Sequence, residues 1–368
     1  MSKIRVIISG GGTGGHIFPA IAIANALKKL QEDIEILFVG ALGKMEMEKV
    51  PAAGYKIIGL NIAGFNRSLT LKNLSFPFKL IGSLFQSFKI VKDFKPNVVV
   101  GVGGFASGPV MYAASKKNIP TVIQEQNSYA GVTNKILGKR AKKICVAYEN
   151  MDRFFPSERI TRTGNPVRQD ILNLEGKCEL GMDTFNLDPN KKTLLVIGGS
   201  LGARSINLAV KENIGRFKDA DVQVIWQTGK LFIDEAKKAV ETANATNIHV
   251  AEFIYTMDQA YAVADVVISR AGASSISELC IVGKPAVLVP FPFAAEDHQT
   301  KNAMALVNEH AAILVADKNA QKEACHNALN LMANDEECKT LSTNIRKLAL
   351  PNADEEIARE ILKLAKAA

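Results

Sequence analysis

A histidine, His16, directly follows a glycine-rich turn near the start of the chain. The stretch SGGGTGGHIFPA, residues 9–20, directly follows the short apolar run 4–8. A strand that leads through such a turn into a helix would place His16 in the first helical turn. An imidazole titrates near neutral pH, and a helix N-terminus favours its neutral form, which accepts a proton. We therefore predict that His16 is a general base; the alternative is a structural histidine that bonds to a neighbouring carbonyl group.

The glycine spacing of this turn fits more than one class of ligand. Gly10, Gly12 and Gly15 match the G-x-G-x-x-G fingerprint of dinucleotide-binding turns. A P-loop is excluded, because His16 stands where that motif requires lysine. A nicotinamide site is disfavoured, because the second predicted strand ends at residues 39–41 without the acidic residue that holds a ribose. Glycines that only permit tight packing are the remaining alternative.

Three further turns of the same kind lie along the chain. GVGGFASGP (101–109), IGGSLGARS (197–205) and SRAGASSISE (269–278) each follow a short β-branched run. At the carboxyl edge of a parallel sheet, helix N-termini present N–H groups and a partial positive charge to a ligand. Two such turns in each half of the chain predict a ligand held in a cleft between two domains.

Polar residues on and near these turns suit a nucleotide sugar. Ser200 lies where a hydroxyl and backbone N–H groups could hold a diphosphate. Glu278 could accept hydrogen bonds from ribose hydroxyls or, with Ser275, form a helix capping box. Gln299 suits sugar hydroxyls or is merely solvated.

Two candidates precede the second half of the chain. Asn127, together with Glu125, follows the fifth predicted strand at the same edge of the sheet. Arg168 follows the turn in TGNPVR, where it either neutralises a phosphate or fixes the linker.

The elements that must position these residues alternate between strand and helix. Short β-branched runs separated by helix-period stretches are typical of βαβ units and a parallel sheet. We therefore expect an α/β protein of two doubly wound, Rossmann-like domains, residues 1–164 and 165–350, with a C-terminal helix, 351–368, that packs back on the first domain. The expected strands are 4–9, 34–39, 56–60, 97–102, 120–124 and 143–147, then 193–197, 222–227, 248–251, 266–269, 285–289 and 312–315.

Composition narrows the range of partners. The 368 residues carry a formal net charge of +8, which favours an anionic partner, although we expect no nucleic acid. The five cysteines are scattered and no cluster has ligand spacing, so we expect no disulfide framework, no metal site and no cofactor. The uncharged stretch 97–115 is broken by glycines and Pro109 and does not resemble a membrane span, and residues 4–8 are too short for a signal peptide.

One segment is both basic and apolar. No acidic residue lies between Glu48 and Asp93. The opening part of the segment, 69–80, suits contact with an anionic bilayer, whereas we expect its later turns to cover the sheet. Across the whole segment, large apolar side chains repeat at helical spacing, at Leu71, Leu74, Phe78, Ile81, Leu84 or Phe85, Phe88 and Val91. The predicted membrane patch consists of Leu71, Lys72, Leu74, Phe78 and Lys79.

Taken in order, these motifs resemble those of the MurG family, bacterial N-acetylglucosaminyltransferases of peptidoglycan synthesis. The resemblance spans nearly the whole chain and rests on GGTGGHIFPA, GVGGFASGP, QEQNSYAGVTNK, TGNPVR, GGSLGAR, SRAGASSISE and PFPFAAEDHQTKNA. It implies a GT-B glycosyltransferase fold, with two domains facing across a cleft, and an inverting, metal-independent transfer of N-acetylglucosamine (GlcNAc) from UDP-GlcNAc. The acceptor would be the C4 hydroxyl of the muramoyl sugar of lipid I (undecaprenyl-pyrophosphoryl-MurNAc-pentapeptide), at the cytoplasmic face of the cell membrane, and the product would be lipid II.

The resemblance also implies roles for individual residues. His16 matches the proposed base of the family. Donor contacts fall on Thr13, Gly14, Gly15, Asn127, Arg168, Ser200, Ile254, Ala273, Ser274, Ser275, Ile276, Ser277, Glu278 and Gln299. Among them, Ile254 would hold the uracil through its backbone and Glu278 the ribose. Two rival functions keep the same architecture: a nucleotide-sugar epimerase and a non-catalytic nucleotide-sugar sensor at the membrane.

Overall fold

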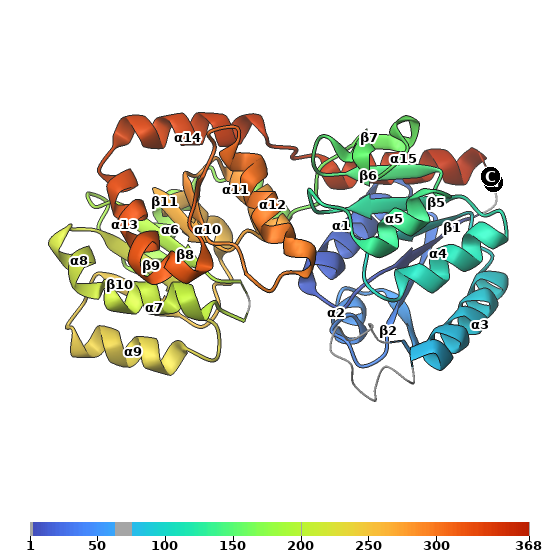
Figure 1. Cartoon of the computed structure of the whole chain (residues 1–368), viewed down its shortest axis with the longest axis horizontal. Coiled ribbons are helices and arrows are strands. Elements are labelled where there is room, and N and C mark those ends of the chain that lie inside the picture. Colours follow the sequence, from blue (N-terminus) through green and yellow to red (C-terminus); the bar gives the residue numbers. More distant parts are fainter. Residues whose placement is uncertain (1–2, 63–75, 200, 368) are drawn as a thin grey trace. The chain divides into compact units, whose positions relative to one another are not determined.

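The computed structural model describes residues 3–62, 76–199 and 201–367. The chain divides into two compact units: Met1–Val167 together with Pro351–Ala368, and Arg168–Leu350 (Figure 1). Each unit has its own parallel sheet, so the predicted pair of doubly wound α/β domains is confirmed. Four residues named above lie outside the described residues: Leu71, Lys72, Leu74 and Ser200.

In the first unit, the described residues form a sheet of seven parallel strands in the order β3-β2-β1-β4-β5-β6-β7. The strands are β1 (Ile4–Ser9), β2 (Ile34–Ala41), β3 (Lys56–Leu60), β4 (Val98–Gly101), β5 (Thr121–Glu125), β6 (Lys143–Val146) and β7 (Ile160–Arg162). The prediction missed β7, because three residues are too few to show a period. The other strands lie within two residues of their expected bounds.

Helices cover both faces of this sheet. On one face α1 (Gly14–Leu30) packs against α15 (Ala353–Ala367), with Ile23 and Ile361 fully buried. The other face is covered by α3 (Phe76–Phe94), α4 (Ser107–Lys116) and α5 (Val132–Gly138). The short α2 (Glu46–Ala52) follows β2. Coverage on both sides explains why the strands carry almost continuous apolar runs.

Helix α3 covers the sheet with its later turns, where Val91 of the predicted stripe is 1% exposed and Phe88 is partly buried against the same core. The buried face carries Ser83 and Ser87, whose hydroxyls each donate to a carbonyl of the preceding turn at 2.7 Å. Serines are small enough to let the helix lie close to its neighbours. The large side chains of the stripe that face solvent are Phe78 (77% exposed), Ile81 (52%) and Phe85 (74%). The expectation that the later turns cover the sheet is therefore confirmed for Phe88 and Val91, and it is wrong for Ile81 and, of the alternatives Leu84 and Phe85, for Phe85.

The second unit repeats the plan, with six parallel strands among its described residues in the order β10-β9-β8-β11-β12-β13. The strands are β8 (Thr193–Ile197), β9 (Gln223–Gln227), β10 (Ile248–Ala251), β11 (Val266–Ser269), β12 (Ala286–Leu288) and β13 (Ile313–Leu314). Its helices are α6 (Lys177–Phe185), α7 (Arg204–Glu212), α8 (Ile214–Asp219), α9 (Ile233–Thr242), α10 (Met257–Val263), α11 (Ala273–Val282), α12 (His298–Val307), α13 (Ala320–Met332) and α14 (Asp335–Lys347).

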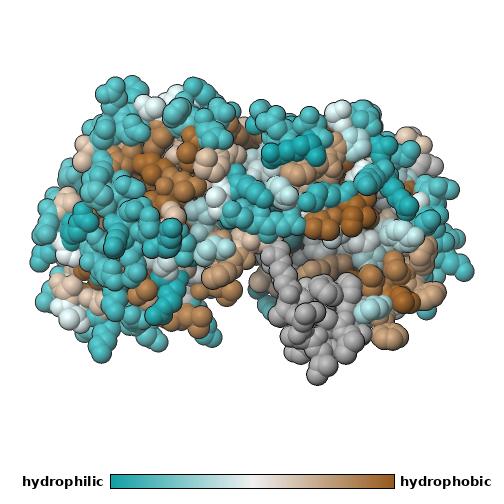
Figure 2. Space-filling model, viewed as in Figure 1, coloured by the Kyte–Doolittle hydropathy of each residue, from teal (hydrophilic) through white to brown (hydrophobic). Residues whose placement is uncertain are grey.

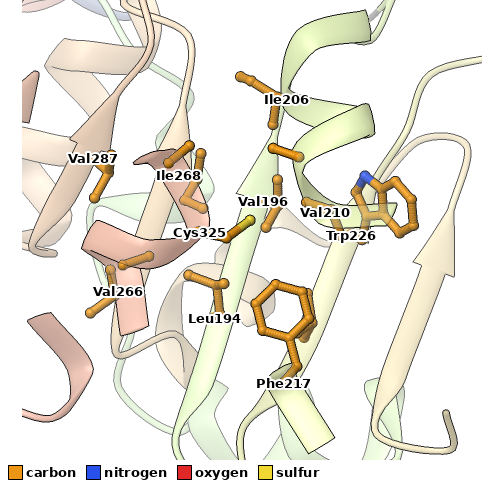
Figure 3. Packing of buried hydrophobic residues seen from close by; sticks show 14 of the residues in the cluster. Leu194, Val196, Ile206, Val210, Phe217, Trp226, Val266, Ile268, Val287 and Cys325 are labelled. Carbon is orange, nitrogen blue, oxygen red and sulfur yellow. The ribbon is translucent and has the colours of Figure 1, made fainter. Parts of the chain in front are cut away.

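The core of the second unit surrounds the only tryptophan of the chain. Trp226 on β9 is fully buried, and its Nε1 donates to Asn207 Oδ1 at 3.0 Å. Figure 3 shows its indole in one cluster with Phe217 and with Leu194 of β8. Fluorescence of Trp226 therefore reports on the packing of this unit alone. Within the described ranges, no helix combines the length and apolar character needed to cross a bilayer.

Candidate active site

The four glycine-rich turns lie where the strand order reverses in each sheet. In the first unit two of them follow β1 and β4, the neighbouring strands at which the order turns back. In the second unit the other two follow β8 and β11, which are neighbours in the same way. Open α/β sheets bind ligands at such points, because the loops diverge there and helix N-termini face the gap. The predicted position of all four turns, between a strand and a helix, is confirmed.

The first unit needs glycine here because its two turns touch through their backbones. The Gly11 N–H donates to the Gly103 carbonyl at 3.3 Å. A Cβ on Gly104, where φ is +84°, would lie 2.3 Å from the Gly11 carbonyl oxygen. A Cβ on Gly10 would lie 2.2 Å from the side chain of Val102. A residue with a side chain would therefore push the turns apart.

His16 lies in the first turn of α1 and contacts the turn after β4. Its Nδ1 lies 3.1 Å from the hydroxyl oxygen of Thr13. A Cβ on Gly103 would come 2.7 Å from His16 Nε2, so the imidazole contacts the glycine backbone. When Nδ1–H donates to the hydroxyl, the lone pair of the ring lies on Nε2. Thr13, Gly14 and Gly15, all predicted site residues, share this helix start, and Thr13 and Gly15 are exposed.

The carboxylate of Glu46 holds this turn in place, a role that the sequence did not reveal. Glu46 is 1% exposed; its Oε2 accepts the Gly12 N–H and its Oε1 the Ala41 N–H, both at 2.9 Å. Gly11 makes room for the carboxylate, since a Cβ there would lie 2.2 Å from Oε1. Backbone donors compensate for the burial of the charge. An acidic residue at a helix start is ordinary, so nothing in the sequence marked this contact.

Glu125, at the end of β5, is turned inward and fixes the loop that carries Asn127. Its carboxylate accepts the N–H groups of Asn127 and Gly131, both at 3.1 Å, and Nδ2 of Asn134 at 2.8 Å. Burial raises the pKa of the Glu125 carboxyl, which is 2% exposed. Of these two candidates, Glu125 therefore positions the loop, and ligand contact by Asn127 stays a prediction.

In the second unit, Glu278 lies in α11 beside Tyr261 and Arg168. The fully buried Tyr261 donates its O–H to Glu278 Oε2 at 3.1 Å. Burial raises the pKa of Glu278 to about 7, and the charge of Arg168 and the hydrogen bond from Tyr261 offset only part of this rise. Because α11 begins at Ala273, Ser275 lies inside the helix, and the capping-box alternative is wrong.

The remaining predicted donor contacts lie on loops and helix starts of the second unit. The Ile254 N–H donates to Gln227 Oε1 at 2.9 Å. Gln299, in the first turn of α12, accepts the Phe291 N–H through its Oε1 at 2.9 Å. The run Ala273–Glu278 forms the opening turns of α11. In the part of the chain that the structure describes, no group of three or more His, Cys, Asp or Glu is arranged to hold a metal ion.

Comparison with known proteins places this chain in a family. Residues 6–146 match the glycosyltransferase family 28 N-terminal domain, and residues 193–359 match its C-terminal domain. A protein of Parabacteroides distasonis named UDP-N-acetylglucosamine–N-acetylmuramyl-(pentapeptide) pyrophosphoryl-undecaprenol N-acetylglucosamine transferase is 54% identical over 364 residues, 99% of each chain. The crystal structure of Acinetobacter baumannii MurG matches 98% of this chain and 99% of its own, at 29% identity and a TM-score of 0.77. The chain belongs to the MurG branch of glycosyltransferase family 28.

Membership of family 28 makes the protein a glycosyltransferase. The fold by itself would not decide this. UDP-GlcNAc 2-epimerase from Neisseria meningitidis, solved with UDP-GlcNAc, matches 98% of this chain and all of its own at 17% identity and a TM-score of 0.66. Such a likeness shows a shared fold, and one fold serves several reactions. The reaction class therefore follows from the family.

Replacing Glu46 with Gln is expected to destabilise the first unit by about 1–3 kcal/mol. The carboxamide oxygen can accept one of the two N–H groups, but its NH2 group then faces the other buried donor. A lower midpoint of urea unfolding, followed by far-UV circular dichroism, measures the loss. The control is Glu48→Gln, since the Glu48 side chain is 78% exposed two positions further along α2. The role of Glu46 is refuted if E46Q and E48Q both unfold with the wild-type midpoint.

The stability of the ligand-free second unit should fall as the pH rises through 7, and Glu278→Gln should abolish that fall. The pKa of about 7 in the folded protein lies above the ordinary 4.5. The protonated carboxyl therefore contributes stability that is complete below pH 4.5 and lost as the pH rises through 7, by roughly 1–3 kcal/mol. Urea unfolding followed by Trp226 fluorescence between pH 4.5 and 8 measures the change. If the stabilities of wild type and E278Q changed in parallel with pH, Glu278 would not be the group responsible for the fall.

Proposed function

We propose that the protein transfers GlcNAc from UDP-GlcNAc to the C4 hydroxyl of the muramoyl sugar of lipid I, forming lipid II. The observation that carries this proposal is the extent of its similarity to a transferase named for that donor and acceptor, which covers 99% of both chains at 54% identity. A similarity of that extent includes both units and therefore both halves of the expected site. Within each unit, the place of the glycine turns at the reversal of strand order supports it, as does the position of His16 in the first and of Glu278 in the second.

His16 supplies the base in this mechanism. With Nδ1–H donated to Thr13, Nε2 takes the proton of the C4 hydroxyl as its oxygen attacks C1 of GlcNAc. The bond from C1 to the diphosphate oxygen breaks on the opposite face, and UDP leaves with the bonding electron pair. The configuration at C1 is therefore inverted. A single displacement requires one base and no covalent carboxylate intermediate.

Residues of the second unit hold the nucleotide. Glu278 accepts hydrogen bonds from the ribose hydroxyls, which favour its ionised form and lower the pKa that burial raises. The backbone of Ile254 carries the uracil, and Gln299 meets sugar hydroxyls. The diphosphate lies against the turn after β8 and the N-terminus of α7. Backbone N–H groups and the helix dipole there balance the charge of the departing UDP in place of a metal ion.

We assign further donor contacts to the first unit. They lie at the start of α1 and on the loop after β5, which both follow the carboxyl ends of strands. The residues are Thr13, Gly14, Gly15 and Asn127. Glu46 and Glu125 act on this group only through the backbone that they hold.

We further propose that α3 rests on an anionic membrane surface, from which the lipid acceptor is drawn. Phe78, Ile81 and Phe85 form an exposed apolar stripe along the helix, with Lys79 and the exposed Lys89 beside it. Figure 2 shows hydrophobic side chains at the surface where Figure 1 places α3. Apolar side chains flanked by lysines are typical of surfaces that insert into the headgroup region of anionic bilayers.

Transfer of radiolabel from UDP-GlcNAc to a lipid I analogue tests the reaction, and it should proceed equally with EDTA. His16→Ala is expected to lower kcat about 10²–10⁴-fold, with the KM for UDP-GlcNAc changed by about threefold at most, because the base acts only in the transition state. The control His326→Ala, at an exposed site on α13, should behave as wild type.

Three results would contradict parts of this mechanism. An undiminished kcat in H16A would remove His16 as the base. Loss of transfer in EDTA would show that a metal takes part. A new sugar epimer formed from UDP-GlcNAc without acceptor would replace the transferase with an epimerase.

Replacing both Phe78 and Phe85 with Ser should weaken binding to phosphatidylglycerol-containing vesicles about tenfold or more, because two large apolar groups no longer enter the bilayer. Vesicle co-sedimentation measures the binding. Turnover of a water-soluble acceptor should stay at the wild-type rate. Leu180→Ser, at a half-exposed site on α6 of the second unit, is the matched control. Equal sedimentation of F78S/F85S and L180S would exclude α3 as the contact.

A further inference from the structure

The side chain of Gln227 joins two loops of the second unit. It is 3% exposed and is the last residue of β9. Its Oε1 accepts the Ile254 N–H at 2.9 Å, and its Nε2 donates to the Gly199 carbonyl at 3.1 Å. One carboxamide therefore bridges the loop after β10 and the glycine turn after β8.

The register of the sheet places Gln227 for this double contact. Gln227 pairs with Ile197 of β8 on one side and with Ala251 of β10 on the other. Both neighbouring strands end at these partners, so both loops leave the sheet beside the carboxamide. Gly199 and Ile254 lie at the start of those loops. The contact is thus set by the strand order and not by the local sequence around Gln227.

A primary amide is the group that satisfies both loops at once. The Ile254 N–H requires an acceptor and the Gly199 carbonyl a donor; a carboxylate offers no donor, and an apolar side chain offers neither. The Gly199 carbonyl also accepts the Gly202 N–H at 3.0 Å, the bond that closes the glycine turn. Because Gln227 is buried, water would not readily replace the lost partners.

We propose that Gln227 is a positioning residue that fixes the distance between the loop that holds the uridine and the turn that holds the diphosphate. This inference rests on the proposed assignment of UDP-GlcNAc to the second unit. A ligand with two linked parts gains affinity when its two half-sites are already spaced to receive them. Without Gln227 each half-site keeps the residues that contact its part of the ligand. UDP should then gain less affinity over uridine from its diphosphate.

The ratio of the dissociation constants of uridine and UDP measures that advantage. It is to be determined by calorimetric titration of the full chain, as wild type, Gln227→Leu and Gln227→Glu. Both variants are expected to lower the ratio about fivefold to tenfold, mainly by weakening UDP, since each loses one or two hydrogen bonds. The KM for UDP-GlcNAc should rise by a similar factor, with a smaller change in kcat.

Gln223→Leu is the matched control. Gln223 lies on the same strand, is 4% exposed, and donates to the Asp188 carbonyl at 2.9 Å, away from both loops. Its loss should reduce stability without changing the ratio. Unfolding followed by Trp226 fluorescence shows that each protein is folded. Q227E, which keeps an acceptor for the Ile254 N–H, serves if Q227L does not fold.

A ratio that falls in the Gln227 variants but not in Q223L supports the inference. An unchanged ratio in folded Q227E, or an equal fall in Q223L, overturns it. Wild-type protein that binds neither UDP nor UDP-GlcNAc would instead remove the proposed function, and the inference with it, so the two failures are distinguishable.

Discussion

Close approach of backbones at the carboxyl edges of the two sheets is the constraint on which the site depends. In the first unit a Cβ on Gly104 would meet the Gly11 carbonyl at 2.3 Å, and in the second a Cβ on Gly202 would meet the Thr228 carbonyl at 2.0 Å. In both units the contact involves a turn that flanks the reversal of strand order. Side chains there would move the turns, and with them the helix N-termini that can face an anionic ligand.

Close packing alone does not set the turns; buried polar side chains do so in each unit. Glu46 accepts the N–H of Gly12, Glu125 accepts that of Asn127, and Gln227 links Gly199 to Ile254. Each of these side chains is buried, so a backbone arrangement that withdrew its hydrogen-bond partners would leave a buried polar group unsatisfied. Buried side chains that need not contact a substrate therefore fix the loops of the site.

The two units carry different chemistry on the same scaffold. The first unit presents a histidine whose Nδ1 lies beside a hydroxyl, an arrangement suited to proton removal by Nε2. The second presents a partly buried carboxyl whose pKa is raised to about 7, which polar ligand groups can return to its charged form. The proposed mechanism assigns the base to the first unit and the nucleotide to the second.

Local patterns were sufficient for much of this protein. The alternation of short apolar runs with helix-period stretches predicted the strands of both sheets, except for the three-residue β7. The glycine-rich motifs predicted four places where a strand leads into a helix. The same motifs indicated the family and singled out His16 and Glu278. The sequence could not show that Phe85 faces solvent, or that Glu46 and Gln227 are turned inward. Those outcomes belong to the tertiary structure, because a hydrogen bond or a buried face shared by residues far apart along the chain leaves no period or spacing in the sequence.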